Sequence, residues 1–395
     1  MNANAIKKIF DAMINPPVGW QDELYFYNRT GQKIRYAYAP HIGENKGTVV
    51  LTHGYGENIN LYHETVKEYQ EAGYEVWAMD WQGHGLSDRD DPNKPLKPSA
   101  RGMLRHTHDL DFFVQNLVKS SHDDNKPLIM NTHSMGGHIG LLYLKRFPGV
   151  FDAAVMSAPM FDIYRLGLGR WARPVIRGIF NLAASLGLEK HHVPANAEIW
   201  RGITSATKQL KNVITRTGKT LRNIFNDMVR EAYPDAKLGR PTFGWVSEAY
   251  RTIIPSTTPE FLKSIKTPVL IGSAEFEDLV DNKAHERAAE IMPNAEHIFV
   301  KDATHGLWFQ DEGPYTIWRD KVFSFIDKIS ADNPHEISAN TEICDIADGE
   351  NLCRPLRGNH AVYMNREMPP DFKALFPYDD FEREIDNDPD GPAPP

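Results

Sequence analysis

Short apolar runs alternate with longer amphipathic stretches over the first 160 residues of the chain. Short β-branched runs are typical of buried strands, and apolar residues spaced three or four apart are typical of helices that cover them. The expected elements are strands at Leu24–Tyr27, Lys33–Ala39 and Thr48–Thr52, a helix at Leu61–Ala72, a strand at Tyr74–Met79, a helix at His106–Lys119, a strand at Pro127–Asn131, a helix at Gly137–Phe147 and a strand at Ala153–Ser157. The first two strands form a hairpin, and the later alternation predicts a mostly parallel sheet with helices on both faces.

The alternation stops near residue 160 and returns near residue 256. Helical spacing continues between these points without a clear strand, which indicates a helical insertion. The elements expected after it are strands at Pro268–Ile271 and His297–Lys301 and helices at His285–Ile291 and Ile317–Ile329. The predicted organisation is a first core part at 1–159, a helical cap insertion at 160–255, a second core part at 256–330 and a C-terminal tail at 331–395.

The composition is that of a soluble globular protein, with 41% hydrophobic and 25% charged residues among 395. It excludes a mostly disordered chain and a fibrous repeat. No apolar run reaches the roughly 18 residues of a membrane span, and the N-terminus lacks the apolar stretch and cleavage site of a signal peptide. Two cysteines cannot build a disulfide framework. We therefore expect a cytoplasmic protein.

The net charge of −9 is distributed unevenly along the chain. The tail at 331–395 holds 15 acidic and 5 basic residues, and its Pro- and Asp-rich end predicts partial disorder. Residues 160–251 instead hold 15 basic and 7 acidic residues. A basic excess can attract phosphate groups, although a solvated helical surface would look the same.

Several function classes have no support in the sequence. It holds no dinucleotide-binding, P-loop or nucleic-acid-binding motif, so we expect no cofactor and no nucleic-acid partner. Two cysteines and two histidines in the tail have spacings too irregular for a zinc site, so we expect no metal. These four residues are His335, Cys344, Cys353 and His360.

The segment Ile129–Gly137 places a serine directly after a predicted strand and before a predicted helix. This is the context of a nucleophile elbow, a sharp turn that lifts the hydroxyl group above the sheet edge. The backbone then passes close to the helix, and Gly136 and Gly137 provide the space. Thr132 is a mild departure, because the usual pattern has glycine there. We expect Ser134 to be a nucleophile; the alternative is a helix-capping serine.

A serine nucleophile needs a base and an acid that orients the base. In folds that carry the serine on a nucleophile elbow, these residues follow along the chain in the order serine, acid, histidine. His305 follows the predicted strand at His297–Lys301 and is the best of the 16 histidines for the base. The acid should follow the preceding strand, where four carboxylates occur. We favour Glu277, and Asp278 is the second candidate.

Two backbone N–H groups must stabilise the negative oxygen that forms during acyl transfer. One should belong to Met135, the residue after the nucleophile. The other should come from the glycine-containing turn His53–Gly56, and we assign it to Tyr55. The loop Asp80–Ser87 follows the next strand and is interpreted as structural support at the same sheet edge.

Together these residues resemble the serine α/β-hydrolases, in particular the monoacylglycerol lipase and lysophospholipase group. The matching pieces lie between about residues 20 and 330 and are His53–Gly56, Asp80–Ser87, His133–Gly137, Ser157–Met160, Glu277–Asp281 and Ala303–His305. The segments Leu238–Val246 and Glu277–Asn282 are similar to those of bacterial membrane-associated lysophospholipases. The tail matches nothing in the family.

The resemblance implies an α/β-hydrolase fold, with a mostly parallel central sheet, helices on both faces and a helical cap. It also implies hydrolysis of the acyl ester of a lysophospholipid through an acyl-enzyme intermediate, without a cofactor. The acid would be a glutamate, at Glu277, where many relatives carry aspartate.

The cap insertion carries two further hypotheses. A strongly apolar helix at Val175–Leu188 would admit an acyl chain or lie on a bilayer surface; the alternative is packing against the core. A basic cluster would bind an anionic headgroup or an anionic bilayer. Its members are Arg216, Lys219, Arg222 and Arg230.

We therefore expect a lipid ester hydrolase in the cytoplasm, with peripheral contact to the inner membrane surface through the cap. Three alternatives stay open. They are a monoacylglycerol lipase or broad carboxylesterase, an aminopeptidase-like hydrolase, and a non-catalytic α/β-hydrolase scaffold. The sequence leaves oligomeric state, headgroup and acyl-chain preference open.

Overall fold

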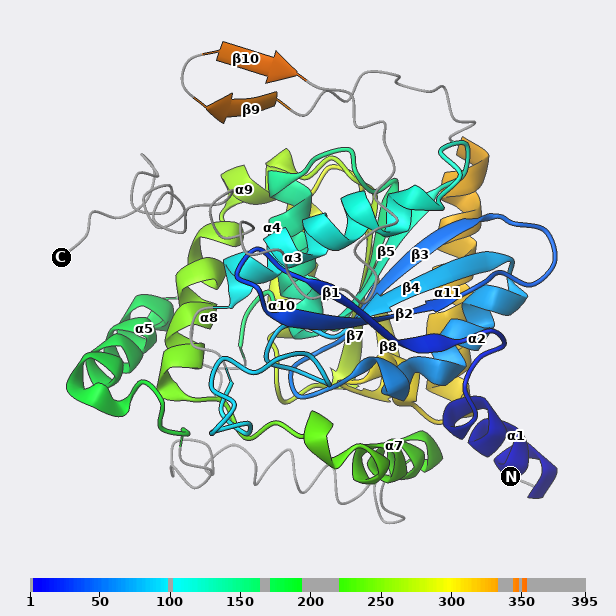
Figure 1. Ribbon diagram of the computed structural model, residues 1–395, viewed down its shortest axis with the longest axis horizontal. Helices are drawn as coiled ribbons and strands as arrows, with labels where there is room; N and C mark the ends of the chain where they lie inside the picture. Colours follow the sequence, from blue (N-terminus) through cyan, green and yellow to red (C-terminus); the bar gives the residue numbers. More distant parts are fainter. Residues whose placement is uncertain are drawn as a thin grey trace.

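A central sheet of eight strands organises the protein (Figure 1). The computed structural model describes residues 3–98, 102–163, 171–193, 220–332, 344–347 and 350–353. The strand order is β1-β2-β4-β3-β5-β6-β7-β8; β2 is antiparallel to both neighbours, and the remaining pairs are parallel. The strands are β1 (Gln21–Tyr27), β2 (Lys33–Ala39), β3 (Gly47–Thr52), β4 (Tyr74–Met79), β5 (Leu128–His133), β6 (Ala153–Ser157), β7 (Val269–Phe276) and β8 (Ala295–Thr304).

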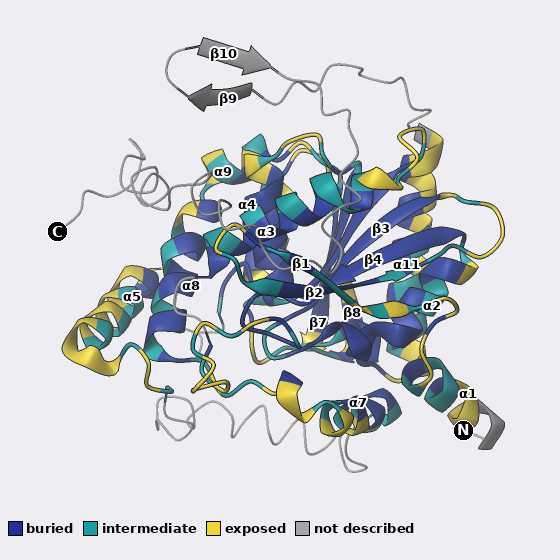
Figure 2. Ribbon diagram, in the orientation of Figure 1, coloured by how far each residue is buried: buried dark blue, intermediate teal, exposed yellow. Residues whose placement is uncertain are grey.

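Helices bury both faces of the sheet, as the alternating pattern predicted. One core contains side chains of α3 (Met103–Asn116), α4 (Met135–Arg146) and α10 (Asn282–Ile291). The other contains those of α2 (His63–Glu71) and α11 (Glu312–Asp332). Strands β3 to β6 are buried along their whole length, and β3 and β4 are visible as dark blue ribbons in Figure 2. The fold is the α/β-hydrolase fold.

Most predicted elements are confirmed with small shifts of their ends. The strands at 74–79 and 153–157 have the predicted bounds. β7 continues past the predicted Ile271 as far as Phe276, because β8 pairs with it along this stretch. The final helix begins earlier, at Glu312, since Pro314 lies in its first turn and a proline is tolerated there. Short helical turns complete the core at η1 (Ile59–Tyr62), η2 (Val118–Ser120) and η5 (Leu307–Phe309).

The insertion between β6 and β7 is helical in the part that the structure describes. Its elements are α5 (Ala172–Ala183), the π-helical turn η3 (Ala184–Leu188), α7 (Leu221–Ala232), the short turn η4 (Pro234–Ala236), α8 (Phe243–Ser256) and α9 (Pro259–Ser264). α8 joins the cap to the core, because Trp245, Ala249 and Ile253 are buried in the same core as α3 and α4. α5 packs against α8 on the outer side (Figure 1).

An N-terminal helix that the sequence did not predict contacts the cap. Side chains of α1 (Ala3–Ile14) pack against Phe225 of α7. Lys67 of α2 closes the C-terminal end of α1, donating from Nζ to the carbonyls of Asp11, Ala12 and Asn15 at 2.8–3.0 Å. A cation in this position compensates the carbonyls that a helix end leaves unpaired.

The tail contains an antiparallel pair of strands, β9 (Cys344–Ala347) and β10 (Glu350–Cys353), which form a separate sheet. The fading pattern after residue 330 did not predict these strands. No helix among the described residues has the length and hydropathy that crossing a bilayer requires.

Candidate active site

Ser134 lies at a strained turn between β5 and α4. Its backbone has φ 52° and ψ −116°, a region that residues with a side chain rarely adopt. Two hydrogen bonds hold it there: its N–H donates to the carbonyl of Ser157 at 3.0 Å, and its own carbonyl accepts from the N–H of Met160 at 2.8 Å. This is the geometry of a nucleophile elbow.

Two glycines allow the turn to pack closely, as predicted. A Cβ at Gly136 would lie 2.7 Å from the carbonyl oxygen of His53, and one at Gly137 would lie 2.6 Å from Cβ of Pro159. The same Cβ at Gly137 would lie 3.4 Å from Oγ1 of Thr132. Thr132, which stands where the usual pattern has glycine, is thus at ordinary contact distance from position 137, and the close approach there is that of Pro159.

Three loops at the carboxyl ends of the strands bring Ser134, His305 and Glu277 together. Nε2 of His305 lies 2.8 Å from Oγ of Ser134, and Nδ1 lies 2.8 Å from Oε2 of Glu277. Of the two candidate acids, Glu277 is the one that accepts this hydrogen bond. Its other oxygen accepts the N–H groups of Leu279 and Val280 at 2.9 and 3.2 Å, which fixes the carboxylate.

The electrostatics of this group match its hydrogen bonds. Burial alone would lower the pKa of His305, but the charge and hydrogen bond of Glu277, with smaller contributions from Glu57 and Asp278, raise it above its usual value. Burial would raise the pKa of Glu277, but the charge and hydrogen bond of His305 and two backbone donors lower it overall. The arrangement thus favours an ionised carboxylate beside an imidazole that can take up a proton.

The two predicted oxyanion donors belong to segments that contact or adjoin the nucleophile. Met135 is the first residue of α4, and a first-turn N–H has no acceptor within its helix. The turn before Tyr55 lies against the serine, since a Cβ at Gly54 would be 3.1 Å from Cβ of Ser134. The Tyr55 hydroxyl donates to the carbonyl of Gly239 at 2.8 Å, so this turn also contacts the cap.

Glu57 is a residue of the site that the sequence reasoning missed. Its Oε2 accepts the N–H of Gly54 at 2.8 Å and the hydroxyl of Tyr62 at 2.6 Å. Its Oε1 lies 3.7 Å from Nε2 of His133, whose ring centroid is 4.8 Å from that of His305. The sequence did contain a signal for it, because Glu57 directly follows the turn His53–Gly56. The N–H groups of such a turn need hydrogen-bond acceptors, and a neighbouring carboxylate can provide them.

Asp80 supports the turn His53–Gly56, in agreement with the structural role predicted for Asp80–Ser87. Its carboxylate accepts the N–H groups of Ile59 and Leu86 at 2.9 Å each, and lies 3.3 Å from both Arg35 and His53. Burial would raise the pKa of Asp80, but the hydrogen bond from His53 and the charge of Arg35 lower it overall. A fully buried, ionised carboxylate therefore fixes the start of the turn His53–Gly56.

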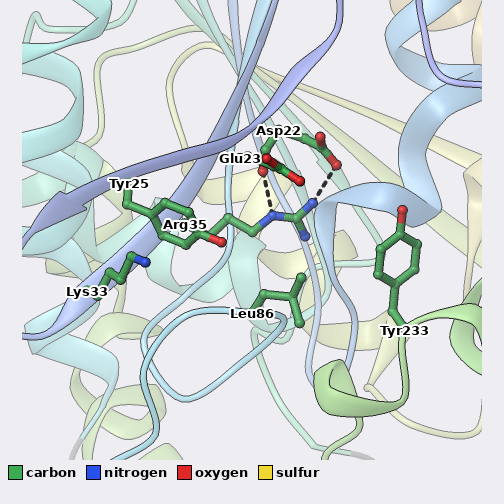
Figure 3. Close-up of a pocket in the computed structure, with 7 residues that line it drawn as sticks. All are labelled: Asp22, Glu23, Tyr25, Lys33, Arg35, Leu86 and Tyr233. Atoms are coloured by element: carbon green, nitrogen blue, oxygen red, sulfur yellow. Dashed lines mark hydrogen bonds and ion pairs between the residues drawn. The ribbon is translucent and has the colours of Figure 1, made fainter. Parts of the chain in front are cut away.

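A hollow of about 330 Å³ lies next to Arg35, at the edge of the sheet that β1 and β2 form (Figure 3). It is lined by Asp22, Glu23, Tyr25, Lys33, Arg35, Leu86 and Tyr233. The guanidinium of Arg35 donates to the carboxylate of Asp22 at 2.6 Å, to its carbonyl at 2.8 Å, and to Asn60 at 2.7 Å. Arg35 thus connects β1 and β2 to Asp80.

The structure corrects the prediction for one member of the basic cluster. Arg222 is 2% exposed, and its Nε and Nη2 donate to the two carboxylate oxygens of Glu64 at 2.7 and 2.8 Å. Its Nη1 donates to the carbonyl of Gln310 at 2.9 Å. A buried guanidinium with these partners attaches α7 to the core and is not available to a headgroup. Arg216 and Lys219 lie outside the described residues.

Arg230 is the described member of the cluster that stays partly exposed. Its side chain is 39% exposed and lies 3.5 Å from Asp227, one turn earlier on α7. Burial would raise the pKa of Glu57, but the charge of His133, the hydrogen bond from Tyr62 and, to a smaller extent, the charge of Arg230 lower it overall. A positive charge from the cap therefore acts on a carboxylate next to the candidate active site.

Comparisons with known proteins agree with the fold. The fold defines an α/β-hydrolase, and residues 43–312 match the family described as serine aminopeptidase, S33 (Hydrolase_4). The chain belongs to this family. Lysophospholipase L2 of Escherichia coli strain K12 is 27% identical over 297 residues, which cover 71% of this chain and 80% of the relative. The monoacylglycerol lipase of Mycolicibacterium smegmatis is 37% identical over 124 residues, or 30% of this chain and 40% of the relative.

Solved structures show the same architecture. A carboxyl esterase from Bacillus coagulans aligns with a TM-score of 0.60 at 15% identity, covering 79% of this chain and 99% of the esterase. A soluble variant of monoglyceride lipase from Saccharomyces cerevisiae aligns with a TM-score of 0.57 at 20% identity, covering 78% of this chain and 96% of the lipase. At these identities the likeness supports the fold alone.

Proposed function

We propose that the protein is a serine hydrolase that cleaves the acyl ester of lysophospholipids through an acyl-enzyme intermediate. The observation that carries the proposal is the continuous line of hydrogen bonds from Ser134 through His305 to Glu277, with 2.8 Å at each step. The substrate class draws support from the lysophospholipases among the relatives.

The proposed reaction uses only groups of this chain and water. Oγ of Ser134 attacks the acyl carbonyl carbon while Nε2 of His305 takes its proton. The N–H groups of Tyr55 and Met135 bind the oxyanion, and Glu277 stabilises the imidazolium. Collapse of the intermediate breaks the ester bond, and His305 gives its proton to the leaving alcohol oxygen. Water, activated by the same imidazole, then releases the fatty acid.

A monoacylglycerol lipase is the second candidate, because the Mycolicibacterium smegmatis relative with that name is 37% identical over the matched segment. The family description also keeps aminoacyl amides in consideration. The deciding experiment is a hydrolysis panel of a lysophospholipid, a monoglyceride of the same acyl chain and an aminoacyl amide. We expect the highest kcat/KM on the lysophospholipid; a clear preference for another substrate would replace this assignment.

Arg230 is the proposed contact for the phosphate of the headgroup. Replacing it by glutamine removes a charge-assisted hydrogen bond, which typically contributes about 1.5–3 kcal/mol. We expect Arg230→Gln to lower kcat/KM on the lysophospholipid by roughly 10-fold or more and to leave the monoglyceride within about twofold. The matched control is Arg251→Gln, which removes a half-exposed arginine that pairs with Glu248 on α8. Equal losses on both substrates would exclude a headgroup role.

The outer face of α5 and η3 is the proposed contact with a lipid bilayer. Its apolar side chains are 56–72% exposed and follow one another at helical spacing: Trp171, Val175, Ile179, Leu182 and Leu186. The alternative, that this helix packs its apolar face against the core, does not hold for these residues. An apolar helical face of this kind lies in the interface of a membrane, where tryptophan is also favoured. A lipid-ester substrate would be drawn from the same surface.

Aspartate at Leu182 and Leu186 is expected to weaken vesicle binding strongly. Each leucine that enters the interface contributes roughly 1.5–3 kcal/mol, so the double variant should bind vesicles at least about 100-fold more weakly. Sedimentation with phosphatidylglycerol vesicles measures binding, and turnover of a short-chain monomeric ester reports the intact site. The control is Ile317→Asp, because Ile317 is 50% exposed on α11, away from this face. The same loss in both variants would argue against a specific face.

A further inference from the structure

Three hydrogen-bonded polar side chains, two of them fully buried, lie near the elbow and take no part in the catalytic steps described above. Oγ of Ser273, on β7, lies 2.8 Å from Nδ1 of His285 and 2.8 Å from Nε2 of His297. The other nitrogen of His285, Nε2, lies 2.6 Å from the carbonyl oxygen of Pro159. Ser273 and His285 have no exposed surface, and His297 on β8 is partly exposed.

The partners fix which atom donates and which accepts in each of these three hydrogen bonds. A carbonyl oxygen only accepts, so Nε2 of His285 must carry a proton and donate it to Pro159. Burial lowers the pKa of His285 to about 4, so the ring is neutral and Nδ1 accepts the hydroxyl proton of Ser273. Oγ of Ser273 then accepts from Nε2–H of His297. The tautomer of His285 that donates to Pro159 is therefore also the one that accepts from Ser273, so the two hydrogen bonds favour the same ring state.

Pro159 belongs to the turn that holds the nucleophile. The turn at 157–160 makes the two backbone hydrogen bonds to Ser134 described above. The carbonyl of Ser157 accepts from Ser134 at one end of the turn, and the N–H of Met160 donates to Ser134 at the other. Ala158 within it has φ 43°, which is itself an unfavourable backbone conformation for a residue with a side chain. Pro159 also fills the space that Gly137 leaves open. Strained backbone persists only where its surroundings hold it, and the bond from His285 is a side-chain restraint on this turn.

We propose that His285 is a positioning residue for Ser134: through the carbonyl of Pro159 it holds the turn at 157–160, and with it the strained elbow. The inference rests on the proposed function, because it takes Ser134 to be the nucleophile. His285 lies on α10, which begins directly after the loop that carries Glu277. Its hydrogen bond therefore connects the acid side of the site to the nucleophile side.

Two amide variants of His285 separate its two hydrogen bonds. Glutamine places its amide near Nε2 and keeps a donor for Pro159, whereas asparagine places its amide near Nδ1 and keeps only the contact with Ser273. The whole protein is used, with kcat and KM on the preferred ester of the panel. The rate of covalent labelling of Ser134 by a fluorophosphonate and the melting temperature are measured on the same samples.

We expect His285→Asn to lower kcat and the labelling rate together by about 10- to 100-fold, since small misplacements of reacting groups cost on that order. KM should stay within about twofold, and His285→Gln should recover most of the loss. A lower melting temperature with wild-type kcat and labelling in His285→Asn would overturn the inference. If that variant does not fold, Ser273→Ala decides: a fall in labelling of at least threefold supports the proposal, and an unchanged rate overturns it.

A failure of the proposed function would give other results than a failure of the positioning role of His285. Wild-type protein that neither hydrolyses esters nor takes the fluorophosphonate label would remove the role of Ser134, and this inference with it. Wild-type protein that labels at Ser134, together with His285→Asn that labels equally fast, would leave the proposed function intact and overturn the positioning role alone.

Discussion

Ser134→Ala is expected to lower kcat on the lysophospholipid by about 10⁶-fold, because removing the nucleophile of such a unit costs about as much as removing the whole unit. The hydrogen bond from Ser134 to His305 spans 171 residues of sequence, and the alanine variant leaves the imidazole with no group to activate. Residual catalysis of roughly 10³–10⁴ over water should remain from oxyanion binding and substrate placement.

The measurement combines steady-state rates with mass spectrometry of the protein after rapid mixing with substrate. Wild-type protein should gain the mass of one acyl chain, and the Ser134→Ala variant should gain none. Vesicle binding through α5 provides the control, since the alanine variant should bind like the wild type. A variant that keeps a tenth or more of the wild-type rate would show that the hydrolysis proceeds without this serine.

The sequence was sufficient for the core of the site because its residues follow from topology. Parallel strands end at one edge of a sheet, so loops after β5, β7 and β8 had to meet there. The residue types at these three loop positions then limited the choice to Ser134, His305 and two neighbouring carboxylates. The choice between Glu277 and Asp278 needed coordinates, because it depends on which side chain faces the imidazole.

Long-range side-chain contacts could not be predicted in the same way. A basic residue in a sequence does not reveal its partner, and Arg222 pairs with Glu64 across 158 residues. Three residues that restrain the elbow and the oxyanion turn, Glu57, Asp80 and His285, likewise act through contacts between distant segments. For α5 the apolar pattern was clear, but periodicity alone does not say whether protein or solvent lies against that face.

Arg222→Met is expected to reduce the free energy of unfolding by about 3–5 kcal/mol, because it leaves the buried carboxylate of Glu64 without its partner. Glu64 is 8% exposed, and burial raises its pKa even while Arg222 counteracts the effect. The guanidinium also lies 3.8 Å from the ring centre of Tyr315 on α11, so its loss removes packing as well as charge. Urea unfolding followed by tryptophan fluorescence measures the difference.

Two further variants identify the cause of that loss. The double variant Arg222→Met with Glu64→Leu should recover most of the stability, because replacing both charges by apolar groups removes the unpaired carboxylate. Arg319→Met, at a partly exposed arginine that pairs with Glu68 and Asp320, should cost about 1 kcal/mol or less. If Arg222→Met costs no more than this control, the pair does not hold α7. If it costs what we expect, α7 is attached to the core by this pair. Arg230 lies two turns further along the same helix, so the pair also holds the positive charge that acts on Glu57.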